Sequence, residues 1–422
     1  MKDIVQGDTG RRRVTVIGAG NIGICCAIYL QRKGLNVTVI DRLPPGQSCS
    51  SGSAGVLSSW SCILDSVRGI ASSLPGWLLD PEGPLAIRWR YFPTLVPWLV
   101  KFVQSGLNGS FMTKSDALFA LNHSTVELYK ELLSSAGAPE LIRDSSYLFV
   151  YRKENAIDPN SRPFQVRRER GARMDFLTGG EVQEVEPEIS PQYCRGVAIH
   201  DQGHTVNPAR LVQALSDYFC HLGGRILTGE VRHVARRGDG TVQVTAAAHD
   251  LSSDYLIIAA GAWSHQLTAQ LGCRIPLESE RGYHMTFANP GVSISHTILE
   301  GHRQFVTTEM EMGLRSAGTV EFAGLTAPEN PRRSAMLARI ARQLLPNLNT
   351  SEATGWMGHR SALPDSLPVI GPLPDHPNII VAFGHGHTGL TAAPMTGKLV
   401  ADLVAKSSPM PDIARYLPAR FL

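Results

Sequence analysis

Short β-branched runs alternate with amphipathic stretches along this chain, a pattern typical of strands and helices in an α/β fold. The run over residues 14–17 leads into a helical pattern over 24–33 with an apolar face, and a second run follows over 37–40. A buried strand that begins at residue 254 and a short strand over 379–383 repeat the pattern. We therefore expect one α/β domain assembled from segments far apart in the chain, with a second domain inserted between them in two parts.

The intervening segments predict a mixture of elements. Longer amphipathic patterns predict helices over 114–136, 207–222 and 332–345, and a closing helix that runs to Lys406. Further patterns predict strands over 146–151, 225–231 and 241–247, strand-rich sequence over 278–324, and short helices over 164–171 and from residue 177. Pro, Gly and Ser over 43–55 predict a loop, and the Trp- and Pro-rich residues 75–97 predict irregular structure.

The turn after the first strand is a GxGxxG formed by Gly18, Gly20 and Gly23, with Asn21 and Ile22 at the start of the helix. The first glycine permits a tight turn, the second lets a pyrophosphate approach the backbone, and the third lets the helix lie close to the strand. The helix start directs unpaired N–H groups towards the phosphates. This context predicts a dinucleotide site, although an ordinary βαβ unit without a ligand is an alternative.

An acidic residue, Asp41, ends the second strand and is placed to accept hydrogen bonds from ribose hydroxyls. An acid there argues against a 2′-phosphorylated dinucleotide, while the neighbouring Arg42 leaves that question open.

A second strand, glycine turn and helix close the chain, with Gly384 to Gly389 reading GHGHTG. The phosphates already lie at the first turn, so this second helix start would face a different anionic part of the ligand. A flavin fits, because its ring gains negative charge on reduction. Two such turns favour FAD over NAD. His385 and His387 could instead pair on a metal, but no third ligand lies at a suitable spacing, so we expect no metal site.

Composition narrows the class of protein. The 422 residues allow two domains, and 43% hydrophobic with 18% charged residues is typical of an ordinary globular protein. A net charge of +3 does not favour nucleic acid as a partner. Seven dispersed cysteines without a CxxC favour a reducing compartment, and no signal peptide is visible, so we expect a cytoplasmic protein.

The most apolar stretch, 89–103, is interrupted by Pro93, Pro97 and Lys101, so it does not predict a membrane span. We interpret it as part of a domain core. The alternative is a peripheral contact with the inner membrane, or a surface that faces a quinone.

Together these features resemble the D-amino acid oxidase superfamily of FAD enzymes, and most closely its D-amino acid dehydrogenase branch. The resemblance spans nearly the whole chain and rests on VTVIGAGNIG with Asp41, PGQSCSSGSAG, WLLDPEGPLAIRWR, DQGHTVNPARLVQAL, DYLIIAAGAWS, RGYHMTF, LRSAGTVEFAG, WMGHRSALPDSLPVIG and FGHGHTGLTAAPMTGKLVADL. It implies a Rossmann-like FAD domain over 1–80, 196–275 and 352–422. The implied substrate domain, with a mixed sheet that covers the flavin, spans 81–195 and 276–351.

The resemblance also implies roles for single residues. Ser53, Ala54 and Gly55 would pass near the flavin ring, and Val231 would touch the adenine through its backbone. Further cofactor contacts would come from Ala260, Gly261, Gly386, His387, Thr388, Gly389, Leu390 and Thr391. Arg360 matches the arginine that grips the substrate carboxylate, for which bidentate pairing is the physical reason. Tyr283 is a second candidate for the substrate pocket, and core packing is its alternative.

Departures from the family pattern concern the substrate side. Ser361 follows Arg360 where proline is usual, and the strand over 304–312 lacks the tyrosines and extra arginine of some members. Arg281, Arg303 or Arg315 could serve instead, or each could be an ordinary salt-bridged residue. No covalent flavin attachment motif is visible.

The resemblance implies hydride transfer from the α-carbon of a D-amino acid or cyclic imino acid, of the D-proline or cis-4-hydroxy-D-proline type, to flavin N5. Oxygen or a quinone would accept the electrons. Alternatives are an oxidase of an N-methyl amino acid or 2-hydroxy acid, one subunit of a multi-chain dehydrogenase, or a plain NAD dehydrogenase.

Overall fold

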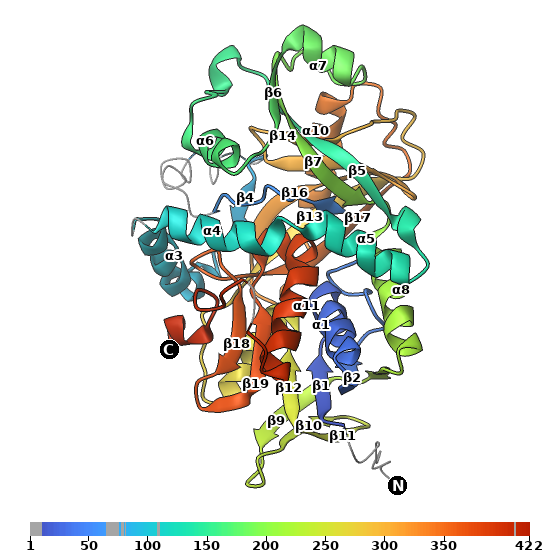
Figure 1. Ribbon diagram of the computed structural model, residues 1–422. Coiled ribbons are helices and arrows are strands. Elements are labelled where there is room, and N and C mark those ends of the chain that lie inside the picture. Colours follow the sequence, from blue (N-terminus) through green and yellow to red (C-terminus); the bar gives the residue numbers. More distant parts are fainter. Residues whose placement is uncertain (1–10, 65–75, 77–79, 81, 108–109, 409–410) are drawn as a thin grey trace.

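The computed structural model describes residues 11–64, 76, 80, 82–107, 110–408 and 411–422, and it contains two large sheets joined by several crossings of the chain. The lower part of Figure 1 is a six-stranded sheet, and the upper part is built on a ten-stranded sheet, with helices α4 (Phe111–Asn122) and α5 (Thr125–Ser135) running between them. This arrangement confirms the predicted combination of a dinucleotide-type α/β sheet with a mixed sheet.

The six-stranded sheet has the order β18-β19-β12-β1-β2-β8, and all neighbours are parallel except β18 and β19. Its strands are β1 (Arg13–Ile17), β2 (Asn36–Asp41), β8 (Arg225–Thr228), β12 (Tyr255–Ile258), β18 (Val369–Leu373) and β19 (His376–Phe383). Because β1, β12 and β19 run in the same direction, the turns that follow them lie at one edge of the sheet. Segments more than 350 residues apart in the chain are thereby brought together.

Both faces of this sheet are buried, which explains its continuous apolar strands. On one face lie α1 (Asn21–Arg32), α8 (Pro208–His221) and α11 (Gly389–Ala405). Helices α1 and α11 pack so closely that a Cβ at Gly397 would lie 2.7 Å from the backbone of Cys25. The other face packs against the antiparallel sheet of β9 (Val231–Arg236), β10 (Val242–Ala246) and β11 (Asp250–Ser253), beside α9 (Ser264–Gln270).

The ten-stranded sheet mixes parallel and antiparallel pairs in the order β17-β13-β16-β15-β14-β5-β7-β3, with β4 and β6 attached to β16 and β7. Helix α10 (Pro331–Leu344) packs on β13 and β16, while α6 (Arg162–Glu169) and α7 (Gly179–Val185) lie at the far end in Figure 1. Its strands are β3 (Val56–Leu57), β4 (Leu85–Ile87), β5 (Ile142–Tyr151), β6 (Met174–Thr178), β7 (Arg195–Thr205), β13 (Glu278–Phe287), β14 (Thr297–Glu300), β15 (Phe305–Met310), β16 (Gly313–Phe322) and β17 (Ala353–Ala362).

Several predicted boundaries were wrong. The single helix predicted over 114–136 is two helices, α4 and α5, separated at His123 and Ser124. The strand predicted over 225–231 is likewise two strands, and the strand that begins near residue 254 ends at Ile258. Part of the predicted irregular stretch 75–97 lies outside the described residues, and part of it starts helix α3 (Phe92–Leu107), which contains Pro97. None of the described helices is long and apolar enough to cross a membrane.

The division into two domains stays a prediction. The predicted FAD domain includes residues 196–275 and 352–422, and the strands β7 and β17 within these ranges pair in the ten-stranded sheet.

Candidate active site

A cavity of about 760 Å³ lies where the two sheets meet. Its walls are the turns after β1, β12 and β19 on one side, the loop after β2 at one end, and strands β13, β16 and β17 on the other side. The carboxyl edge of a parallel sheet is the usual ligand site of such folds. Of the residues predicted to bind cofactor or substrate, all line this cavity except Gly23 and Gly55.

The first glycine turn has the geometry that its spacing predicted. Gly18 has a φ of +111°, and a Cβ there would lie 2.3 Å from the carbonyl oxygen of Ala259. A Cβ at Gly23 would lie 1.8 Å from the Gly18 carbonyl oxygen, so this glycine serves the contact between helix and strand and not the cavity wall. Helix α1 begins behind Gly20, which has no side chain to cap it, and the N–H of Asn21 donates to Ser50 Oγ at 3.1 Å. The helix start therefore opens into the cavity.

Asp41 stands at the end of β2, beside this turn. Its carboxylate accepts hydrogen bonds from the backbone N–H groups of Ala19, at 2.7 Å, and Leu43, at 3.1 Å. Arg42 next to it lies over the ring of Trp263, with 4.0 Å between the guanidinium carbon and the ring centroid. Val231 lines the same end of the cavity. The carboxylate thus ties the glycine turn to the following loop, and its role towards ribose stays a prediction.

The loop after β2 is anchored from the other sheet. Arg315 on β16 donates to the backbone carbonyl oxygens of Ser51, at 2.8 Å, and Ser53, at 2.7 Å. Gly55 has a φ of +77° and accepts from the N–H of Thr205, so it shapes the loop from outside the cavity. Ser53 and Ala54 line the cavity. Arg315, considered above for the substrate carboxylate, therefore serves to hold this loop in place.

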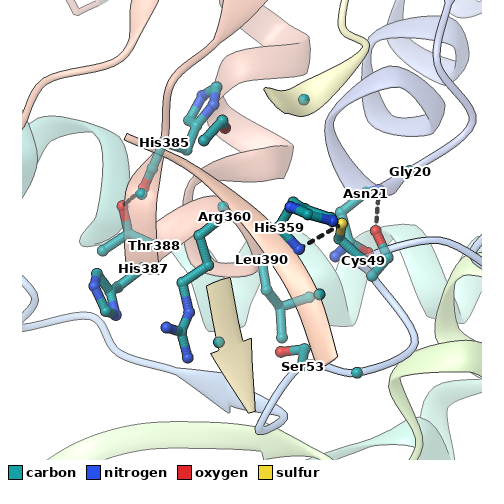
Figure 2. A pocket seen from close by; sticks show the side chains of 18 of the residues that line it. Gly20, Asn21, Cys49, Ser53, His359, Arg360, His385, His387, Thr388 and Leu390 are labelled. Carbon is teal, nitrogen blue, oxygen red and sulfur yellow. Dashed lines mark hydrogen bonds between the residues drawn. The ribbon is translucent and has the colours of Figure 1, made fainter. Parts of the chain in front are cut away.

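The closing glycine turn is a short 3₁₀ turn from Gly386 to Thr388 that leads into α11. Its neighbour His385 is buried, and its Nε2 lies 3.0 Å from Thr396 Oγ1. Burial lowers the pKa of His385 to about 3, which keeps its ring neutral. No cap side chain satisfies the start of α11, and the turn faces the cavity (Figure 2). Two helix starts therefore converge on one cavity, as the sequence predicted.

Arg360 on β17 extends into the cavity (Figure 2). Its guanidinium lies directly over Gly282 on the neighbouring strand β13, where an added Cβ would be 2.3 Å from the Arg360 Cζ. Nη1 also donates to the carbonyl oxygen of Thr319 at 3.2 Å. The absence of a side chain at Gly282 is what gives the guanidinium its position.

The carboxylate of Glu280, which was not predicted from the sequence, completes this part of the site. Glu280 is buried, pairs in register with Arg360, and lies 3.0 Å from Nε2 of His387. Burial alone would raise its pKa, but the hydrogen bond to His387 and the charges of His387 and Arg360 bring the pKa of Glu280 below its usual value. Glu280 is therefore ionised, and it interacts with His387 and Arg360, two residues that were predicted to contact a ligand. The period-two alternation of Glu280, Gly282 and His284 along β13 is the signal that could have revealed it.

Tyr283 also lines the cavity, yet its hydroxyl donates to Glu321 at 2.5 Å and accepts from the N–H of Asn330. Burial and the nearby carboxylate raise the pKa of Tyr283 to about 12. Arg281 is fully buried and pairs with the same Glu321 at 3.0 Å, and Arg303 pairs with Glu82 at 3.0 Å. Neither Arg281 nor Arg303 lines the cavity, whereas Arg360 does, so Arg360 is the one of these three arginines that is placed to meet a carboxylate there.

Three further side chains line the cavity on this side, those of His359, Trp356 and Cys49. His359 donates its backbone N–H to Cys49 Sγ at 3.3 Å, and burial lowers the pKa of its ring to about 4 (Figure 2). Trp356 stacks on His284 with 4.9 Å between ring centroids. Burial raises the pKa of Cys49, so it is a protonated thiol at neutral pH. Among the described residues, no group of three His, Cys, Asp or Glu side chains could hold a metal ion.

The residues present fit a flavin dinucleotide. The cavity runs from Asp41 and Val231 past the first glycine turn to the second turn and Arg360, and its volume is within the range of cofactor sites. The buried Oδ1 of Asn21 at the helix start has no partner within the protein. A ligand with phosphates in its middle and a ring at one end would match this order of groups.

Comparisons with known proteins agree with this geometry. A family model described as FAD dependent oxidoreductase matches residues 13–403. A D-amino-acid oxidase from Bradyrhizobium diazoefficiens is 37% identical over 97% of this chain and 99% of its own length. A D-amino acid dehydrogenase from the same organism is 27% identical with the same coverage. The crystal structure of glycine oxidase from Geobacillus kaustophilus has a TM-score of 0.74 at 21% identity, and covers 97% of this chain and 100% of its own.

Proposed function

This chain belongs to the family of FAD dependent oxidoreductases, and from that premise we propose that it oxidises the α-carbon of a D-amino acid or a cyclic imino acid. The family resemblance and the FAD cofactor predicted from the sequence are confirmed by the family match. Two relatives named for D-amino acids, of which the first is 37% identical, support the D-configuration. The D-proline and cis-4-hydroxy-D-proline type is the finer part of the proposal.

Bound FAD supplies an acceptor for the hydride that leaves the α-carbon. The work of the protein is then to bind and orient the substrate. Arg360 takes the carboxylate in a bidentate pair, which fixes both carboxylate oxygens, and so this one substituent of the α-carbon, relative to the cavity wall. Glu280, held ionised by His387 and Arg360, attracts the guanidinium in turn and so helps to keep it over Gly282.

The substrate amine must be neutral before a hydride can leave, because the product is an imine. A buried cavity lowers the pKa of an ammonium group by desolvation. The positive charge of Arg360 acts in the same direction. The imine then hydrolyses in water to a keto acid and ammonia, or opens in the case of a cyclic imino acid.

One observation supports this proposal above the others: Arg360, whose guanidinium lies over Gly282, lines the same cavity as two helix starts whose N-cap residues make no side-chain capping bond. The arrangement brings a carboxylate-binding group to the end of the cavity opposite Asp41. Oxygen or a quinone would remove the electrons. All seven cysteines are free.

Anaerobic bleaching of the flavin tests the proposal. The FAD-loaded chain would be mixed with D- and L-amino acids, D-proline, cis-4-hydroxy-D-proline, an N-methyl amino acid and a 2-hydroxy acid. We expect bleaching by D-amino acids or by the cyclic D-imino acids, and none by the 2-hydroxy acid. Bleaching only by the N-methyl or 2-hydroxy substrate would overturn the proposed reaction. Reoxidation by oxygen, compared with an artificial quinone, then identifies the acceptor.

A further inference from the structure

Exposed apolar side chains gather on one element of this molecule. Of the nine large apolar residues that the described chain exposes, seven lie between residues 89 and 112, namely Trp89, Phe92, Val96, Val100, Val103, Leu107 and Met112. The intervals of three and four residues from 89 to 107 follow the period of a helix, so these side chains form one stripe along α3 and its preceding turn. We call this set, from Trp89 to Leu107, the α3 stripe.

The opposite side of α3 is also apolar. Leu95 and Trp98 are buried against Phe322 and Ala362 of the ten-stranded sheet. The apolar surface of α3 is thus wider than the face that packs on the sheet, and its exposed polar residues are Thr94, Lys101 and Gln104. Here the described residues cover one face only, and Trp89 and Leu107 remain 72% and 61% exposed. Isolated exposed apolar residues need no explanation, but a continuous stripe marks an interaction surface.

Charge around the stripe points to the kind of partner. From Gly83 to Ser115 the sequence has four basic residues, Arg88, Arg90, Lys101 and Lys114, and no acidic residue. Arg90 and Lys101 are exposed beside the stripe. A second copy of the chain would bring the same basic patch against itself in a two-fold contact, which is unfavourable. An anionic lipid surface complements both the charge and the apolar side chains.

We propose that the α3 stripe lies in the interfacial region of an anionic lipid bilayer and holds the protein at the membrane. Trp89 suits this depth, because its ring is amphipathic and prefers the boundary between headgroups and acyl chains. Helix α3 would lie in the plane of the membrane and would not cross it, in agreement with its 16 residues. The proposal does not depend on the substrate proposed above.

The inner side of α3 lies close to the candidate site. Phe102 lines a small cavity that it shares with Glu280, Gly386 and His387. Docking of the outer side would therefore bring a bilayer to the wall behind the closing glycine turn. An electron acceptor dissolved in that bilayer would be near the flavin end of the main cavity.

Flotation with vesicles tests this proposal. The full FAD-loaded chain would be mixed with vesicles of phosphatidylcholine and phosphatidylglycerol, and with vesicles of phosphatidylcholine alone. Leu107→Glu and Val100→Glu place a charge on the stripe. Leu422→Glu is a matched control, since Leu422 is 54% exposed and lies outside the stripe. Flavin content, and turnover with a water-soluble acceptor, show that each variant is folded.

We expect the parent chain and Leu422→Glu to float with anionic vesicles, and both stripe variants to partition about tenfold more weakly. High salt or neutral vesicles should reduce flotation. Failure of the parent to bind anionic vesicles, or equal binding by Leu107→Glu, would overturn the proposal. A dimer in solution that dissociates in Leu107→Glu, without vesicle binding by the parent, would assign the stripe to a second copy instead. Loss of substrate turnover with retained flotation would contradict only the proposed function.

Discussion

A single methyl group at Gly282 should move the arginine on which substrate binding is proposed to depend. A Cβ added there would lie 2.3 Å from Cζ, 2.4 Å from Nη2 and 2.6 Å from Nη1 of Arg360. Ordinary carbon contacts are about 3.5–4.0 Å, so the guanidinium must move by more than about 1 Å. The atoms that clash are the end of a flexible side chain, and Gly282 does not have a left-handed φ, so the backbone can stay in place.

The magnitude follows from the interaction that is lost. A hydrogen bond to a charged group contributes about 1.5–3 kcal/mol, and a bidentate arginine–carboxylate pair belongs to this strong class. Loss of that geometry in Gly282→Ala should therefore raise KM for the amino acid by about 10- to 150-fold, at about 1.4 kcal/mol per tenfold. Because the atoms nearest to the added methyl group belong to Arg360 and not to the two glycine turns, the affinity for FAD should change by less than about threefold.

Steady-state turnover with an artificial acceptor, over a range of amino acid concentrations, measures this effect. The control is Gly180→Ala in the first turn of α7, where an added Cβ meets nothing within 4 Å. Flavin content and the melting temperature exclude a general loss of structure. An unchanged KM in Gly282→Ala, with FAD bound and the fold intact, would show that Arg360 does not hold the carboxylate.

Three further substitutions test contacts at Arg360, Tyr283 and His385. Arg360→Lys keeps the charge but loses the bidentate fork, so KM should rise by about tenfold. In that background Gly282→Ala should add little, which a double-mutant cycle measures. Additive effects of the two substitutions would show that Gly282 does not act through the position of Arg360. Tyr283→Phe removes the hydroxyl bonded to Glu321, so the melting temperature should fall while KM changes by less than about twofold, and a large KM change would make the tyrosine a substrate group. The pKa of His385 is about 3 in the folded protein and about 6.5 in the unfolded chain, so the unfolded chain binds one more proton between these two pH values. The free energy of unfolding should therefore fall as the pH drops from about 6.5 towards 3. Urea unfolding at several pH values measures this slope, and His385→Gln should flatten it.

Local patterns were sufficient to predict the glycine turns and the acidic strand end that line the cavity. The GxGxxG, Asp41 and the GHGHTG turn each depend on a strand, a glycine turn and a helix that are contiguous in sequence. Backbone conformations such as the positive φ of Gly18 favour one residue type, glycine, so they can be recognised from the sequence. These elements therefore appear where they were expected, apart from Gly23 and Gly55, whose constraint is packing and not the cavity.

The substrate side could not be predicted to the same degree, because it depends on pairing between distant strands. Arg281 and Arg315 remained alternatives to Arg360 in the sequence, and the register of β13, β16 and β17 gives each a different partner. Glu280 was missed for the same reason, since its neighbour His387 is more than 100 residues away. Helix α3 was missed because Pro93 and Pro97 argued against it, although the apolar contacts of Leu95 and Trp98 outweigh that cost.

The connection between the two sheets explains why this site needs both. The parallel sheet alone presents two helix starts, which bind anions but cannot distinguish one small substrate from another. The glycine at 282 on β13 gives room for Arg360 from β17, and Arg315 on β16 holds the loop that leads back to the first glycine turn. A change in strand register by one residue would turn Gly282 and Arg360 to opposite faces. Substrate recognition should therefore be more sensitive to changes in the register of β13 and β17 than FAD binding is. A variant that shifts this register and loses substrate binding should still purify with flavin, and loss of both together would contradict this separation.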